Sequence, residues 1–184
     1  AEIIERPKID DAELRIIVSD ILKDVKENGD AAIKKYSLQF GKVLLKELKV
    51  TDAEIDEAVN LVDEDLKAAI QLSKNNIEKV HAAQKTDDKK IETSKGVLCW
   101  RKSVAIEKVG LYIPGGTAPL FSTLLMLGIP AVMAGCSEIV ICTPPDTNGN
   151  INPVILFTAK LLGLKMIYKV GGVQAIAAMA YGSE

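Results

Sequence analysis

Apolar positions in the first part of the chain recur at the three- and four-residue spacing of amphipathic helices. The runs with this spacing cover residues 14–25, 33–40, 55–62 and 66–80. Gly29 separates the first two runs, and Thr51 with Glu54 has the spacing of a capping box before the third. Between the second and third runs, the short apolar-rich segment 43–50 predicts a strand. The pattern therefore predicts a mainly helical region that contains one short strand.

The long helical run ends near His81, and a charged connector at residues 85–90 follows it. Residues 91–107, with Lys95 and Gly96 as the turn, have the pattern of a β-hairpin. His81 has two interpretations, either a ligand or proton shuttle, or a helix residue that packs beside its apolar stripe. The carboxylates of residues 52–65 fall on polar helix faces and indicate solvated charge.

From residue 109 onward the pattern changes to continuous apolar runs, each followed by a turn and then by helical spacing. Strands are expected at residues 109–113, 138–142 and 165–170, and helices at 120–135, 152–162 and 173–181. Strand, turn and helix repeated three times predict a parallel sheet with right-handed crossovers. Continuous apolar strands indicate a sheet that helices cover on both faces. The expected fold class is α/β, and the last unit reads as if cut in mid-domain.

Composition and charge exclude several classes of partner. The chain is 48% hydrophobic and 26% charged, which is ordinary for a soluble globular protein. A formal net charge of -2 disfavours nucleic acid or an anionic membrane surface as the main partner. The longest apolar stretch, 119–135, contains Ser, Thr, Gly and Pro and is too short to span a bilayer. We therefore expect no nucleic-acid and no membrane partner.

Cysteine and histidine usage bear on compartment and metal binding. The three cysteines have no CxxC spacing, which indicates free thiols in a reducing cytoplasm. A catalytic zinc site usually takes three protein ligands, most often including His. Because the chain has a single His and no Cys cluster, we expect no metal ligands within it.

The turns after the strands are the places to look for a ligand, since open parallel sheets bind ligands at the carboxyl ends of their strands. Pairs of glycines follow the first and third strands, at Gly115–Gly116 and Gly171–Gly172, and the second pair leads into a helix whose free N–H groups favour an anion. The alternative is that these glycines only allow tight turns and contact no ligand. A GxGxxG fingerprint and an acidic residue at the end of the second strand are both absent.

Two side chains stand out near these turns. Tyr112 lies near the end of the first strand, where it either contacts a cofactor or packs in the sheet. Gln174 lies in the first turn of the third helix within an otherwise apolar run, so it either faces solvent or contacts a ligand. The residues alone thus predict an α/β sheet domain with a candidate nucleotide site.

Two segments, in this order and spacing, resemble the histidinol dehydrogenase family. They are VGLYIPGGTAPLFSTLLMLGIPAVMAGCSEIVICTPP at residues 109–145 and KVGGVQAIAA at residues 169–178, and the resemblance covers essentially the whole chain. It implies an enzyme of the last steps of histidine biosynthesis, which oxidises L-histidinol to L-histidine through histidinaldehyde with two NAD. It also implies zinc as a metal cofactor, Rossmann-like domains, an intertwined homodimer and a cytoplasmic location.

The resemblance also assigns residues and domains. The Tyr of YIPGG and the Gln of GGxQA contact NAD in the family, which implies NAD binding by Tyr112 and Gln174. The family's zinc ligands and its catalytic Glu–His pair come after the position of Glu184, so no catalytic or metal residue is assigned here.

Residues 1–108 are then expected to belong to a domain completed downstream. Residues 109–184 would be the first part of an incomplete Rossmann-like NAD-binding domain with three βα units. The expectation is an N-terminal fragment that is inactive by itself. The alternatives are a non-catalytic nucleotide- or metabolite-binding module derived from such an enzyme, and a structural or assembly domain.

Overall fold

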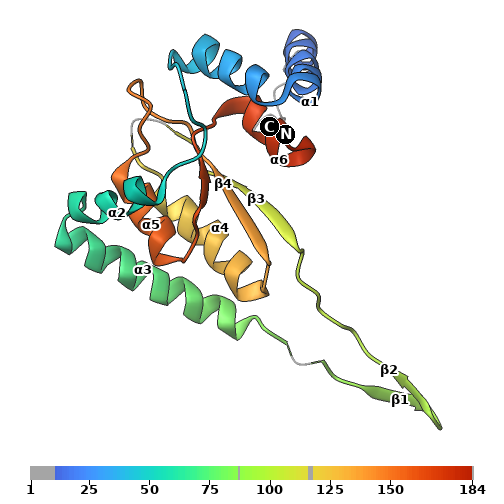
Figure 1. Ribbon diagram of the computed structural model, residues 1–184. Coiled ribbons are helices and arrows are strands. Elements are labelled where there is room, and N and C mark those ends of the chain that lie inside the picture. The colour runs from blue at the N-terminus through green and yellow to red at the C-terminus, as the bar shows by residue number, and fades with distance from the viewer. Residues whose placement is uncertain (1–10, 87, 116–117, 184) are drawn as a thin grey trace, which may run out of the picture.

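A three-stranded parallel sheet forms the centre of the computed structural model, which describes residues 11–86, 88–115 and 118–183 (Figure 1). The strands are β3 (Lys108–Tyr112), β4 (Glu138–Cys142) and β5 (Met166–Tyr168), in the spatial order β3-β4-β5. The helices that follow them are α4 (Phe121–Ala134), α5 (Pro153–Leu161) and α6 (Gly172–Tyr181). The α/β fold with three βα units that the sequence predicted is confirmed.

Helices cover both faces of this sheet, as the continuous apolar strands predicted (Figure 1). In β4, Ile139 and Ile141 belong to the core shared with α4 and α5. Cys142 belongs to the core on the opposite face, shared with α6 and with α1 (Ala12–Gly41), and Val140 packs against it. Alternate residues of one strand therefore enter two different cores, so the strand needs apolar residues at every position.

Helix α1 is two helical segments joined by a kink at Gly29, where φ is 50° and ψ is -128°. An ion pair spans the kink, with the Lys35 ammonium 2.7 Å from an Asp24 carboxylate oxygen. Asn28 donates a further hydrogen bond of 2.7 Å to the other oxygen of Asp24. The break predicted between the first two helical runs is therefore confirmed.

Helices α2 (Asp52–Leu61) and α3 (Glu64–Ala83) pack on the same side of the sheet as α4 and α5. The predicted capping box is present, because Thr51 Oγ1 accepts from the Glu54 N–H at 3.2 Å and the Glu54 carboxylate accepts from the Thr51 N–H at 2.8 Å. In α3 the fully buried Ile70 packs among residues of α4.

The strand expected at residues 43–50 is wrong. The segment forms a single antiparallel bridge, between Lys49 and Tyr168 at the edge of β5. Two backbone bonds flank it: Val50 N–H donates to the Ile167 carbonyl at 2.9 Å, and Lys169 N–H donates to the Leu48 carbonyl at 2.7 Å. Val43, Leu45, Leu48 and Val50 are buried, whereas Leu44 is 74% exposed. Burial of these four side chains, rather than a hydrogen-bonded ladder, explains most of the apolar pattern.

The hairpin expected at residues 91–107 is present but shorter, with β1 (Ile91–Ser94) pairing antiparallel to β2 (Val97–Cys99) and no strand at residues 100–107. It projects away from the sheet and its helices (Figure 1). Each residue of both strands is exposed. The apolar side chains of the two strands are therefore not buried in a core.

Candidate functional site

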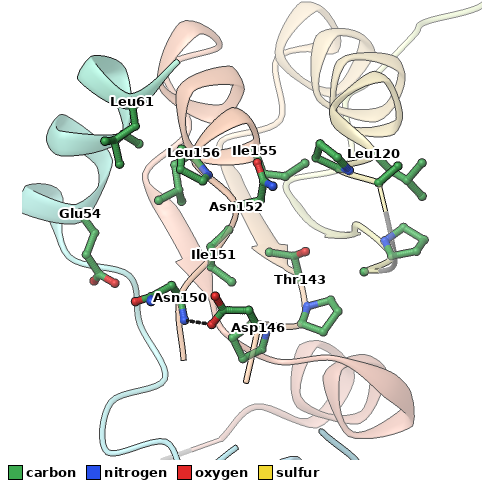
Figure 2. Close-up of a pocket in the computed structure, with 18 of the residues that line it drawn as sticks. Glu54, Leu61, Leu120, Thr143, Asp146, Asn150, Ile151, Asn152, Ile155 and Leu156 are labelled. Atoms are coloured by element: carbon green, nitrogen blue, oxygen red, sulfur yellow. Dashed lines mark hydrogen bonds between the residues drawn. The ribbon is translucent and has the colours of Figure 1, made fainter. Parts of the chain in front are cut away.

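A hollow of about 660 Å³ opens at the carboxyl ends of β3 and β4, against one side of α2 and the first turn of α5 (Figure 2). Its base is apolar, with Ile151, Ile155 and Leu156. Its polar lining residues are Glu54, Glu57, Thr143, Asp146, Asn150 and Asn152. The hollow lies where open parallel sheets bind their ligands, as the sequence predicted.

Asp146 is a lining residue that sequence reasoning missed. It lies in the loop that follows β4, beyond the strand end where an acidic residue was sought. One oxygen of its carboxylate accepts from the backbone N–H of Asn148 at 2.9 Å. The same oxygen accepts from the backbone N–H of Asn150 at 2.8 Å (Figure 2). The sequence signal was the Asp-Thr-Asn-Gly run, which favours such a turn. This carboxylate oxygen holds the loop in place at the rim of the hollow.

A second hollow, of about 410 Å³, lies between α1 and the beginning of α6, and its lining is mostly apolar. Pro144 lines both hollows. Its ring fills the space beside Gly115 and Gly171, where a Cβ on either glycine would collide with it. Close packing against Pro144 therefore accounts for these two glycines. Gly116 lies outside the described residues.

Tyr112 and Gln174, the two predicted NAD contacts, both have side chains close to Gly172. The Tyr112 hydroxyl accepts a hydrogen bond of 3.1 Å from the Gly172 N–H. Gly172 has φ of +66°, and a Cβ there would lie 2.8 Å from Gln174 Oε1. The sheet thus brings both side chains to the beginning of α6.

Gln174 is largely buried, but its side-chain amide faces the second hollow. The residue is 4% exposed and lines the second hollow. Within the described part of the chain, its amide makes no hydrogen bond to another protein group. No side-chain nitrogen or oxygen of the described residues is both buried and without a hydrogen-bond partner, so the Gln174 amide remains accessible from the hollow. Gln174 is therefore a largely buried residue whose amide is available to a molecule in the second hollow.

The first turn of α6 adds to this arrangement. Its N-cap is Gly171, which has no side chain to cap the helix. Gly171, Gly172 and Val173 line the second hollow, so the uncapped beginning of the helix borders it. Free N–H groups and the helix dipole favour an anion or a carbonyl oxygen at this place.

Glu54 corrects the expectation that the carboxylates of residues 52–65 are solvated charges. The Lys169 ammonium donates to one of its oxygens at 2.5 Å, and the side chains of Lys169 and Glu54 are 12% and 31% exposed. Burial alone would raise the pKa of Glu54, but hydrogen bonds from Lys169 and Thr51 outweigh burial and hold the pKa below its usual value. Glu54 is therefore an ionised member of a partly buried ion pair.

No group of three or more His, Cys, Asp and Glu residues comes together as a metal site within the described ranges. His81 is partly exposed near the end of α3, with Nδ1 2.8 Å from Gln84 Oε1, and so packs as an ordinary helix residue. All three cysteines are free, and burial raises the pKa of Cys142 to about 12, so its thiol stays protonated at neutral pH. No described helix is long and apolar enough to cross a membrane.

The family model described as histidinol dehydrogenase matches residues 4–184. The chain belongs to the histidinol dehydrogenase family. It is 56% identical over 184 residues to the histidinol dehydrogenase of Bacteroides thetaiotaomicron, covering 100% of this chain and 43% of the relative. It is 57% identical over 183 residues to that of Bacteroides fragilis, with the same coverage.

A crystal structure of histidinol dehydrogenase from Elizabethkingia anophelis has a TM-score of 0.93 with this fold, at 52% identity. The similarity covers 98% of this chain and 41% of that one. The chain therefore spans less than half the length of the histidinol dehydrogenases that it matches. The resemblance and the fold class inferred from the sequence are confirmed, and the roles of Tyr112 and Gln174 stay predictions.

Proposed function

We propose that this chain forms the N-terminal part of a histidinol dehydrogenase. The complete protein oxidises L-histidinol to L-histidine through histidinaldehyde and reduces two NAD. Family membership over residues 4–184 supports this proposal. The complete protein is further proposed to be a cytoplasmic homodimer without nucleic-acid or membrane partners.

NAD binds at the carboxyl end of the sheet in this proposal, and Tyr112 and Gln174 hold it. The single observation that carries the assignment is their convergence on Gly172 at the uncapped beginning of α6. Because the Tyr112 oxygen already accepts from Gly172 N–H, its own O–H remains free to donate to the cofactor. The partnerless amide of Gln174 offers both donors and an acceptor. Bound NAD supplies the hydride acceptor, while these residues bind and orient it.

The donor atoms of the described residues do not form a site that would fit zinc. Since the described residues form no cluster of metal ligands, we assign its ligands and the proton-transfer residues to the part of the family's chain beyond the matched segment. The 184-residue chain by itself is accordingly expected to reduce no NAD with histidinol.

We also propose that residues 1–108 belong to a domain completed by that further part, and that residues 109–184 begin the NAD-binding domain. The hairpin and the segment after it support the division. Apolar residues alternate with polar or small ones there, yet Leu98, Trp100, Val104 and Ile106 are 53%, 54%, 76% and 71% exposed. Alternation of this kind is typical of a half-buried strand, and an isolated hairpin is marginally stable in water. Further chain packed against this segment would bury these apolar side chains and stabilise the hairpin.

The test is NAD reduction by the complete reading frame with histidinol and zinc, with the 184-residue chain as control. Activity in the complete protein alone supports the proposal. Activity in the 184-residue chain would contradict the assignment of the chemistry to the remaining part. A complete protein that binds NAD but is inert with histidinol would favour the binding-module alternative.

A further inference from the structure

The Glu54–Lys169 ion pair joins two segments that are far apart in the sequence. Oε1 of Glu54 accepts from Lys169 Nζ, and Oε2 accepts from the backbone N–H and the hydroxyl of Thr51 at 2.8 and 2.9 Å. Both carboxylate oxygens are therefore committed to protein donors. The Lys169 backbone N–H is held as well, by the Leu48 carbonyl at 2.7 Å.

Lys169 lies between the end of β5 and the Gly171–Gly172 turn that begins α6. These two glycines carry no side chain that could fix the turn, and glycine has the widest backbone freedom. The position of the turn must therefore be set by its neighbours. Pro144 packs on Gly171, and Lys169 anchors the chain immediately before the turn.

The placement of this turn decides where the two proposed NAD contacts lie. Gly172 holds the Tyr112 hydroxyl through its N–H, and Gln174 follows it in the first turn of the helix. Lys169 itself lines neither of the two hollows at this end of the sheet. A change at Lys169 would therefore reach NAD only through the turn.

We propose that the Glu54–Lys169 ion pair positions the β5–α6 turn for NAD, so that Lys169 is a positioning residue that acts through Gln174. This inference rests on the proposed NAD site. Loss of the lysine charge releases the anchor before the turn, and the Gln174 amide then samples positions that do not bind the cofactor.

The test is a double-mutant cycle on NAD affinity in the complete protein, measured by titration calorimetry with NAD. Lys169→Met is expected to weaken binding about 3- to 30-fold, the usual size of indirect coupling. In a Gln174→Ala background the same change is expected to have less than about a twofold effect, because residues that act together are non-additive. Lys169→Arg, which keeps the charge, is expected to restore most of the affinity.

Lys160→Met is the matched control. It removes another ion pair of α2, between Lys160 of α5 and Asp56 at 2.7 Å, which includes no residue of the β5–α6 turn. NAD affinity within about twofold of the wild type is expected for it, because indirect coupling requires a shared structural element. An equal loss of affinity in Lys160→Met would show that any loosening of α2 suffices and would overturn the proposal.

The remaining outcomes separate this inference from the proposed site. A wild-type protein without NAD affinity, or a Gln174→Ala variant that binds as well as wild type, refutes the site itself. If Gln174→Ala weakens binding but Lys169→Met does not, or if the two effects simply add, the positioning role is wrong. If thermal unfolding shows that Lys169→Met does not fold, Glu54→Gln replaces it in the test. Glu54→Gln removes the same ion pair and is also expected to lower NAD affinity, and unchanged affinity would refute the positioning role.

Discussion

Gly172→Ala tests two roles of Gly172 at the beginning of α6. The residue adopts a backbone conformation with positive φ, and it leaves space for the side chain of Gln174. The backbone there has φ of +66°, which an L-residue with a Cβ adopts at a cost of about 1 to 2 kcal/mol. The added Cβ would also lie 2.8 Å from Gln174 Oε1, the far end of a side chain that can move away. The change should therefore cost about 1 to 2 kcal/mol of unfolding free energy and also displace the Gln174 amide.

Gly163→Ala is the matched control, because Gly163 has φ of +73° and a Cβ there would meet nothing within 4 Å. Both variants should lower the melting temperature of the complete protein by similar amounts, about 2 to 8 °C in a domain of this size. Only Gly172→Ala should weaken NAD binding, about 2- to 10-fold for the loss of one hydrogen bond.

Thermal unfolding by circular dichroism and NAD titration by calorimetry provide the two readouts. Equal NAD affinity in Gly172→Ala and Gly163→Ala would refute the reasoning, because the Gln174 amide would then have no part in binding. A melting temperature unchanged in both variants would refute the strain argument at these glycines instead.

Three further predictions concern the kink, the sheet and the site. Asp24 has its pKa lowered to about 2 by hydrogen bonds from Lys35 and Asn28, so the stability it adds is present above its usual value and lost as pH falls toward 2. Asp24→Asn should therefore destabilise at pH 7 in urea unfolding and match the wild type near pH 2, whereas a constant difference would contradict this. Ile141→Ala, at a position 0% exposed in the sheet, should cost about 2 to 5 kcal/mol in the same assay, and a loss below 1 kcal/mol would refute its core role. Tyr112→Phe should leave far-UV circular dichroism unchanged and weaken NAD binding, and undiminished binding would remove Tyr112 from the site.

Local periodicity was sufficient for most elements of the fold. The helices, the hairpin and the three parallel strands follow from apolar spacing and from turn residues such as Lys95–Gly96, because these signals act between neighbours in the chain. Residues 43–50 show the limit of such reasoning. Their apolar pattern indicates burial correctly except at Leu44, but a strand also needs a partner along its length, and the edge of β5 provides a single bridge.

The candidate site was predicted in part. Tyr112 and Gln174 were found from their motifs, whereas their meeting at Gly172 was not, since Gly172 and Tyr112 are 60 residues apart in the chain. Asp146 escaped notice because it lies in a loop past the strand end. The sequence contains each of these residues, but it does not show which of them lie close together in the fold.

The sequence by itself determined the class of fold, the order of its elements and the family to which the chain belongs. Only the tertiary structure decided that Lys169 pairs with Glu54, a residue 115 positions earlier whose carboxylate looks like solvated helix charge. The physical reason is that periodicity and capping are local, whereas the burial of an ion pair depends on which segments the sheet brings together.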